Sequence, residues 1–493
     1  VSESFTETFA AGLASYGAQP CIEFEDRWFS GDDITEYGRA IESALRAAGV
    51  DDRAPVGLVV RNRLQHAAAI IGCLAAGRPL SMIYSFQSPE SIGRDVETLE
   101  LSAILADRED WTGDVITAAK RAGSAGVAIS LTTPTVEVVD GLERRDETRR
   151  HTGAEPDVAL QILTSGTTGP PKRQAIKTPV LERTVFSVTS GEAAPANAPP
   201  ELAYWQFGGI GVCQLVAGVH NTRRIVMLER FTVDGYVHVV KKHGIRRGGV
   251  QPAVFRMLLD AAVPEEDLAS LDFLISASGP LDPETRDEFE AHFGVPVRLA
   301  YGATEFAGSL CAWTNDLYDK FGVSKRHSVG RPLPDTQVRI VDAETGVELP
   351  AGEQGLLEAK VAPISPEWIR TTDIASIDTD GFVTLHGRAD GAINRGGFKV
   401  LPEIVRRVLI SHPAVRDACV VGVADRRLGH VPFAAIEVMP GMSAPSDDEL
   451  KALVRQKLPV YNVPVAFTAV DELPRNPALK VSLPAVAALY EPR

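Results

Sequence analysis

The sequence is poor in cysteine, in basic charge and in long apolar runs. Its five cysteines are scattered, without the close Cys-x-x-Cys spacing of a structural zinc site or a redox pair, and they predict reduced thiols. The most apolar run, residues 67–76, is too short to cross a bilayer, which excludes a membrane span there. The formal net charge of −15 disfavours a nucleic-acid partner, because such a partner requires a basic surface.

The length of the chain, 493 residues, exceeds the size at which a single hydrophobic core usually splits, so we expect at least two domains. Residues 1–10 do not show the basic region followed by an apolar stretch that marks a signal peptide. A cytoplasmic enzyme is therefore the expectation.

Short β-prone runs alternate with helical stretches early in the chain and return further along it, which is the rhythm of βαβ units in a mostly parallel sheet. The β-prone runs are 56–60, 79–83, 102–106, 158–163, 225–228 and 273–275. A helix is predicted over 34–48, with Asp32 and Asp33 as candidate N-caps. The segment 180–200, rich in glycine and proline at its end, predicts a surface crossover.

The character of the sequence changes near residues 387–391. Beyond this point two further β-prone runs, 419–423 and 433–438, precede a predicted helix over 448–458. About 100 residues suffice for a small α+β domain. The change of character marks a candidate hinge.

A loop of Gly, Ser and Thr, residues 164–172, directly follows the apolar run 160–163. Glycines let backbone N–H groups approach an anion, hydroxyls add donors and a lysine adds charge, so the loop predicts phosphate binding. A Walker A loop would end in Gly-Lys-Ser or Gly-Lys-Thr, whereas this loop ends in Pro171-Lys172-Arg173. A P-loop NTPase is therefore disfavoured.

The loop resembles the signature loop of the adenylate-forming superfamily, which includes acyl-CoA ligases and the adenylation domains of peptide synthetases. Further motifs similar to those of this family follow in order at 277–281, 301–305, 368–373, 387–391, 395–400 and 474–481. The resemblance covers nearly the whole chain. It implies an α/β fold with a large N-terminal domain of helix-flanked β-sheets, residues 1–388, and a small mobile α+β C-terminal domain, residues 389–493.

The resemblance also implies the residues of a site for ATP and AMP. Tyr301 would stack on adenine, and Asp373 would accept hydrogen bonds from the ribose hydroxyls. The implied catalytic residues are Lys480, Thr304 and Glu305, with Glu305 and Thr168 as ligands of Mg²⁺. The implied nucleotide-binding residues are Thr164, Ser165, Gly166, Thr167, Thr168, Gly169, Lys172, Ser278, Gly279, Tyr301, Gly302, Asp373 and Arg388.

For the second half of the reaction, the resemblance implies rotation of the C-terminal domain about Asp390. It places coenzyme A against Gly396, Gly397 and Phe398. The implied acyl pocket is formed by Trp205, Gln206, Phe207, Gly208, Gly209, Ala277, Ala300 and Ala303. These residues are uncharged, so an apolar carboxylic acid is the expected substrate.

Three positions that are usually glycine in the family carry side chains here: Arg173, Thr372 and Leu479. A Cβ at a glycine position can block close approach or exclude a positive φ. This raises the hypothesis of an enzyme that only thioesterifies an acyl-adenylate, supplied by a separate adenylating ligase. Other departures are Gln206, where relatives often have His, and Ile404 and Arg406, where acidic residues are usual.

The main functional prediction is an acid–CoA ligase, in which a carboxylate attacks the α-phosphate of ATP and CoA then displaces AMP. The thioesterification-only enzyme is one alternative. A stand-alone ligase that loads a carrier protein and a non-catalytic binding module are two others.

Overall fold

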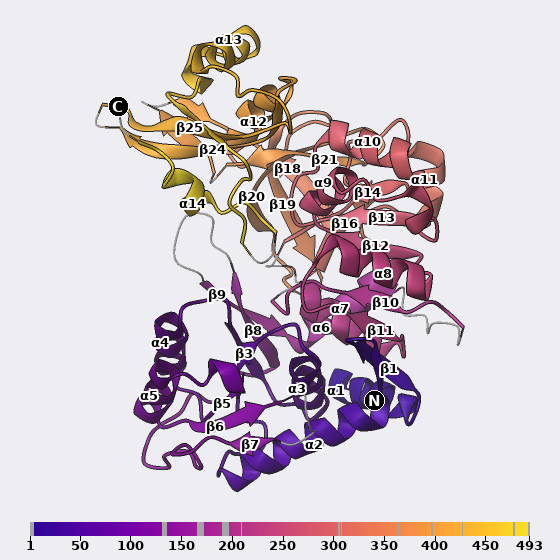
Figure 1. Ribbon diagram of the computed structural model, residues 1–493, viewed down its shortest axis with the longest axis vertical. Helices are drawn as coiled ribbons and strands as arrows, with labels where there is room; N and C mark the ends of the chain where they lie inside the picture. Colours follow the sequence, from indigo (N-terminus) through magenta and orange to yellow (C-terminus); the bar gives the residue numbers. More distant parts are fainter. Residues whose placement is uncertain are drawn as a thin grey trace.

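The structure, a computed structural model, consists of a large N-terminal part and a small C-terminal part (Figure 1). The α/β fold class predicted from the sequence is confirmed. The residues that the structure describes are 4–130, 136–164, 172–189, 197–208, 210–303, 306, 308–362, 364–389, 391–395, 398–425, 427–476 and 479–491.

A seven-stranded sheet, in the order β7-β6-β5-β3-β4-β8-β9, forms the first body of the large part. Its five inner strands are parallel, as the sequence predicts, and β7 and β9 are antiparallel at the two edges. The strands are β3 (Val56–Val60), β4 (Leu80–Tyr84), β5 (Ala103–Asp107), β6 (Ala125–Ile129), β7 (Glu137–Val138), β8 (Val158–Thr164) and β9 (Lys172–Lys177).

Helices cover both faces of this sheet, which explains why its inner strands are apolar throughout. Alternate residues of β3 point to opposite faces. Val56, Leu58 and Val60 join the cluster with α1–α3, whereas Val59 joins the cluster with α4 and α5. The helices are α1 (Phe5–Tyr16), α2 (Gly31–Ala47), α3 (Leu64–Ala75), α4 (Pro89–Leu99) and α5 (Gly113–Ala122).

Two smaller sheets form the next body. In the first, β1 (Pro20–Phe24) pairs in parallel with β11 (Ile225–Met227), and β2 (Arg27–Ser30) and β10 (Glu201–Ala203) complete it. The second contains the parallel strands β12 (Arg247–Val250), β13 (Phe273–Ser276) and β14 (Val297–Leu299). The helices of this region are α6 (Thr178–Thr189), α7 (Ile210–His220), α8 (Val233–His243), α9 (Pro252–Asp260) and α10 (Pro283–Phe293).

Antiparallel strands follow along the chain. One sheet holds β15 (Tyr301–Ala303), β16 (Gly308–Ala312) and β17 (Arg331–Pro332), with α11 (Asn315–Phe321) beside it. The next is a meander of β18 (Thr336–Val341), β19 (Gly355–Val361), β20 (Ile369–Ile377) and β21 (Val383–Arg388).

The C-terminal part has its own five-stranded sheet and its own apolar cluster. Its strands are β22 (Ile393–Arg395), β23 (Phe398–Val400), β24 (Val415–Asp425), β25 (Gly429–Val438) and β26 (Phe467–Val470). Its helices are α12 (Pro402–Ile410), α13 (Asp447–Lys457) and α14 (Leu483–Ala487). The predicted strands and helix of this region are confirmed, whereas the boundary at residue 388 stays a prediction.

Two details of the sequence analysis were wrong. The cap of α2 is Ser30, whose side chain accepts from Asp33 N, so Asp32 and Asp33 lie in the first turn. The predicted crossover 180–200 begins as helix α6, because Val180, Leu181 and Val185 are buried at helical spacing. All five cysteines are free in the structure. Across the described ranges, no helix is both long and apolar enough for a membrane crossing.

Candidate nucleotide and acyl site

Tyr301, Asp373 and Arg388 lie side by side. Strand β20 pairs with β21 so that Asp373 and Arg388 are direct partners. Tyr301 donates its hydroxyl proton to Asp373 Oδ2 over 2.5 Å, across 72 positions of sequence. Burial and the neighbouring carboxylate raise the pKa of Tyr301, so its hydroxyl stays protonated at neutral pH. The structure thus brings together three residues that the sequence assigns to one nucleotide site.

Thr372, one of the three substituted glycine positions, holds Arg388. Arg388 Nη2 donates to Thr372 Oγ1 over 2.7 Å, and Ala389 N donates to the Thr372 carbonyl over 2.7 Å. The Thr372 hydroxyl, which a glycine would lack, therefore orients Arg388, a cation predicted to belong to the nucleotide site.

Arg173, the second such position, lies in β9 and extends its side chain across β8 to β4. Its Nη1 donates to the Met82 carbonyl over 2.8 Å. Its Nη2 lies 3.4 Å from Asp95 Oδ2 in α4. The guanidinium is thus bound between the sheet and a covering helix. Thr164 and Lys172, at the two ends of the predicted phosphate loop, are partners in the β8–β9 pair.

Leu479, the third position, has φ +59°, in the left-handed region that side-chain-bearing residues rarely adopt. Its N–H donates to the Asn476 carbonyl over 2.8 Å, and Lys480 N donates to Asn476 Oδ1 over 3.1 Å. Leu479 therefore adopts the left-handed backbone conformation that a glycine would adopt. Because it has a side chain, this conformation raises the free energy of the folded state by about 1–2 kcal/mol.

Lys480 lies in the C-terminal part of the chain. The positive charge of Arg388, at the end of β21, contributes to a change in its pKa. Desolvation by the surrounding protein, followed by the positive charge of Arg388, lowers the pKa of Lys480. Leu479, the residue before it, packs against an apolar cluster of the large part, so the loop that carries the lysine lies on that part.

The carboxyl ends of β12, β13 and β14 gather further predicted residues, as parallel strands do at one edge of a sheet. Ala277 N donates to the Val250 carbonyl over 3.2 Å, and Ala300 N donates to the Ser276 carbonyl over 3.0 Å. Ser278 follows with φ +73°, and Gly279 lies against the Pro252 ring. Tyr301 and Gly302 continue directly from Ala300 into β15, which ends at Ala303.

The predicted acyl-pocket segment around Trp205 is fixed by Asn62, a residue that the sequence analysis missed. Asn62 Nδ2 donates to the Trp205 carbonyl over 2.7 Å, and Asn62 Oδ1 accepts from Phe207 N over 2.9 Å. Trp205 Nε1 donates to the Gly249 carbonyl over 2.8 Å, which ties the segment to β12. Asn62 is almost fully buried. A polar residue just beyond an apolar strand is the sequence feature from which its role could have been predicted.

Tyr84 also borders this segment and was also missed. A Cβ added to Gly208 would lie 2.6 Å from Tyr84 Oη, so the tyrosine presses against the glycine. Tyr84 stacks on the exposed ring of Phe86 with centroids 5.0 Å apart. Burial raises the pKa of Tyr84 to about 12, which keeps its hydroxyl protonated. Gln206, half-buried, accepts from Gly208 N through its carbonyl over 2.6 Å.

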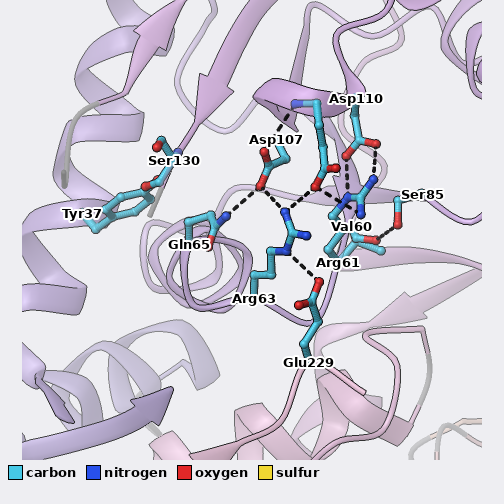
Figure 2. Close-up of polar contacts among 11 residues, drawn as sticks. Tyr37, Val60, Arg61, Arg63, Gln65, Ser85, Asp107, Asp110, Ser130 and Glu229 are labelled. Carbon is cyan, nitrogen blue, oxygen red and sulfur yellow. Dashed lines mark hydrogen bonds and ion pairs between the residues drawn. The ribbon is translucent and has the colours of Figure 1, made fainter. Parts of the chain in front are cut away.

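An ionic network on both sides of Asn62 joins the first sheet to the second body. Figure 2 shows Arg63 between Asp107, 3.1 Å away, and Glu229, 2.7 Å away, with Gln65 donating to the same Asp107. Arg61 forms two bonds of 2.9 and 2.7 Å to Asp110. The network fixes the turn that presents Asn62 to the acyl segment.

Phe398, predicted to meet coenzyme A, lies in the C-terminal sheet. Its side chain is 58% exposed and stacks on Tyr461 with centroids 4.8 Å apart. Arg395 Nη1 donates to the carbonyls of Tyr461 and Val463 over 2.8 and 3.1 Å, which holds the stacked pair together.

Several predicted residues lie outside the described residues and stay predictions. They are Ser165, Gly166, Thr167, Thr168, Gly169, Gly209, Thr304, Glu305, Asp390, Gly396 and Gly397. The expected Mg²⁺ ligands, Thr168 and Glu305, are among them. Elsewhere in the described chain, no three His, Cys, Asp or Glu side chains are grouped to hold a metal.

Two family models match this chain. The model described as AMP-binding enzyme matches residues 9–361, and the model described as AMP-binding enzyme C-terminal domain matches residues 406–480. The chain belongs to the AMP-binding enzyme family. The resemblance to the adenylate-forming superfamily is thereby confirmed.

Curated relatives include acid–CoA ligases. The chain is 28% identical over 486 residues to 4-coumarate–CoA ligase-like 9 of Oryza sativa subsp. japonica, with 91% of this chain and 84% of the relative covered. It is 31% identical over 363 residues to a probable 2-succinylbenzoate–CoA ligase of Mycobacterium tuberculosis, with 68% and 85% covered. It is 29% identical over 454 residues to sulfoacetate–CoA ligase of Cupriavidus necator, with 88% and 87% covered.

Solved structures share the fold along almost the entire chain. The amide bond synthetase McbA from Marinactinospora thermotolerans aligns with a TM-score of 0.81 at 22% identity, covering 99% of this chain and 100% of that one. ATP-bound MatB from Rhodopseudomonas palustris aligns with a TM-score of 0.81 at 20% identity, covering 98% and 99%. This chain therefore shares the overall fold of these two structures.

The contact between Gly208 and Tyr84 predicts a measurable coupling. Gly208→Ala forces the Tyr84 hydroxyl to move and should destabilise the protein by about 1–3 kcal/mol, as overpacking does. In a Tyr84→Phe background the same substitution should cost less, because the nearest oxygen is gone. Thermal unfolding of the four proteins of this double-mutant cycle measures the coupling.

Gly248→Ala is the matched control, because its added Cβ would find its nearest neighbour, Leu274 Cδ2, at 3.9 Å. Its unfolding midpoint should hardly change. Strict additivity of Gly208→Ala and Tyr84→Phe would contradict the contact.

Proposed function

We propose that the chain is an AMP-forming acid–CoA ligase that converts an apolar carboxylic acid to its CoA thioester through an acyl-adenylate. Membership of the AMP-binding enzyme family and the acid–CoA ligases among its relatives support the class of reaction. The observation that carries the proposal is the grouping of Tyr301, Asp373 and Arg388 by the β20–β21 pairing and by the hydrogen bond from Tyr301 to Asp373.

The donor set at this corner fits a nucleotide. A carboxylate, Asp373, suits the two ribose hydroxyls, and an aromatic ring, Tyr301, offers a face to a base. Two cations, Arg388 and Lys480, suit the phosphate. In the proposed reaction, Mg²⁺ when bound would offset phosphate charge, and the residues expected to hold it are Thr168 and Glu305.

In the first half-reaction a carboxylate oxygen of the acid attacks the α-phosphorus of ATP, and the bond to pyrophosphate breaks. In the second, the sulfur of CoA attacks the carbonyl carbon of the adenylate, and AMP leaves with the electron pair of the broken C–O bond. Lys480 would lie between two anions, the attacking carboxylate and the α-phosphate. Its charge would lower their repulsion and stabilise the transition state. Asp373 and Arg388 would also raise the rate by holding the nucleotide in the position required for attack.

We favour the complete two-step reaction over thioesterification alone because each substituted glycine position is accommodated. Arg173 points to β4, Thr372 binds Arg388, and Leu479 adopts the positive φ. At none of the three positions does the added side chain give a clear steric reason for slow adenylation.

The proposed acid is apolar. Trp205 and Phe207 are buried, Ala277 and Ala300 are small, and Tyr84 adds an aromatic wall beside Gly208. Such a lining favours an acid with an apolar or aromatic body and disfavours a second carboxylate or an amine.

Separate assays of the two half-reactions test this proposal. With a panel of apolar acids, the enzyme should release pyrophosphate from ATP and, with CoA, form the thioester. Lys480→Ala should slow adenylation on the order of 100- to 1000-fold, as loss of one stabilising charge does. The same variant should consume synthetic acyl-adenylate and CoA at close to the parent rate.

Lys457→Ala, in α13 of the same C-terminal part, is the charge-matched control. Absence of pyrophosphate release alongside turnover of synthetic adenylate would favour the thioesterification-only enzyme. Turnover with holo carrier protein in place of CoA would favour the carrier-loading ligase. Absence of both half-reactions would contradict the proposal.

The interaction of Lys480 with Arg388 predicts a pH dependence. The lysine must be protonated for adenylation, and its pKa is lowered, so kcat/KM should fall as pH rises through a value below the ordinary 10.5 of lysine. Arg388→Gln removes the repelling charge and should move this alkaline limb, the fall of kcat/KM at high pH, to higher pH. The maximum kcat/KM of this variant should be lower. Lys480→Arg should abolish the fall at high pH, because arginine stays protonated. An alkaline limb that stays in place in Arg388→Gln would contradict the assignment.

A further inference from the structure

Leu479 joins the C-terminal part of the chain to the apolar core of the large part. The half-buried side chain packs against the cluster built from β10–β14 and α8–α10, which includes Trp205, Val254 and Phe255. Leu281, at the turn after β13, packs against the same cluster. A residue that is usually glycine in the family thus supplies an apolar contact between the two parts.

The loop that carries Leu479 is held to its own sheet, so the contact acts on the whole C-terminal part. Arg475 and Val481 form an isolated antiparallel bridge on either side of the loop. Arg475 Nη1 donates to the Leu479 carbonyl over 3.2 Å, and its Nη2 donates to Asp417 Oδ2 in β24 over 3.3 Å. Leu479 therefore cannot leave the large part without Lys480 and β24 moving too.

Charged groups support the same docking. Arg416 of β24 forms an ion pair with Asp260 at the end of α9. Its other nitrogen, Nη1, lies 3.2 Å from Glu437 Oε1 in β25. Near the start of the C-terminal part, Arg407 Nη2 donates to the His386 carbonyl over 3.2 Å. The contacts of Arg416 with Asp260 and of Arg407 with His386 thus also join the C-terminal part to the large part.

We propose that Leu479 is a positioning residue that docks the Lys480 loop on the large part and biases the enzyme toward its adenylating arrangement. A glycine would adopt φ +59° freely but would bury no side chain. Leucine accepts an unfavourable backbone conformation and gains burial only while the C-terminal part is docked. The proposal rests on the proposed function, in which the C-terminal part changes position between two half-reactions.

The experiment measures position and chemistry separately. Spin labels at Glu266→Cys and Arg455→Cys, both exposed and one on each part, report the distance between the parts of the ligand-free enzyme in a Cys213→Ser background. In Leu479→Ala and Leu479→Gly, the population at the docked distance should fall several-fold. Adenylation should fall about tenfold in both variants, while thioesterification of synthetic acyl-adenylate should be unchanged or faster.

Two further variants keep the test specific. Leu479→Met restores an apolar side chain and should retain the docked population and the parent ratio of half-reactions. Met442→Ala removes an exposed apolar side chain from the same part and should change neither measurement.

Unchanged distance distributions in Leu479→Ala and Leu479→Gly would overturn the proposal. Faster adenylation in Leu479→Gly at an unchanged distance would overturn it too, because the side chain would then only strain the loop. If the parent enzyme catalyses neither half-reaction, the proposed function fails, and the distance measurement still decides whether Leu479 docks the two parts.

Discussion

The antiparallel pairing of β20 with β21 is the constraint on which the site depends. It sets Asp373 opposite Arg388, and side-chain hydrogen bonds with Tyr301 and Thr372 then help to hold the two residues. A slip of one strand by one residue would direct its side chain of this pair to the other face of the sheet and so separate Asp373 from Arg388. Arg388 is therefore placed by backbone pairing with the strand that carries Asp373.

Much of the fold could be predicted from the sequence because the inner strands of a parallel sheet are buried on both faces. The run 56–60 is apolar throughout for this reason, and its predicted bounds coincide with those of β3. Helix α6 was missed because the glycine and prolines further along the segment outweighed the spacing of Val180, Leu181 and Val185. Residues of the signature motifs could be assigned because each combines an uncommon residue type with a fixed neighbourhood.

The contacts of Asn62, Tyr84 and Arg173 could not be predicted from the sequence. Each follows from strands that are distant in sequence and lie together only after the sheet forms, such as β4 beside β8. The substituted glycine positions illustrate the same point. Sequence reasoning assigns a steric cost to a Cβ, but the effect depends on where the rest of the side chain finds partners. Arg173 finds a carbonyl, Thr372 finds a guanidinium and Leu479 finds an apolar cluster.

We expect the corner built from Tyr301, Asp373 and Arg388, with Lys480 brought to it by the C-terminal part, to hold an acyl-adenylate. A crystal structure with a non-hydrolysable acyl-sulfamoyl adenosine tests it most directly. The account predicts ribose hydroxyls on the Asp373 carboxylate, the Lys480 ammonium beside the sulfamoyl oxygens, and Arg173 still bound to the Met82 carbonyl. An analogue bound away from Asp373, or Lys480 directed into solvent with the analogue in place, would contradict the account.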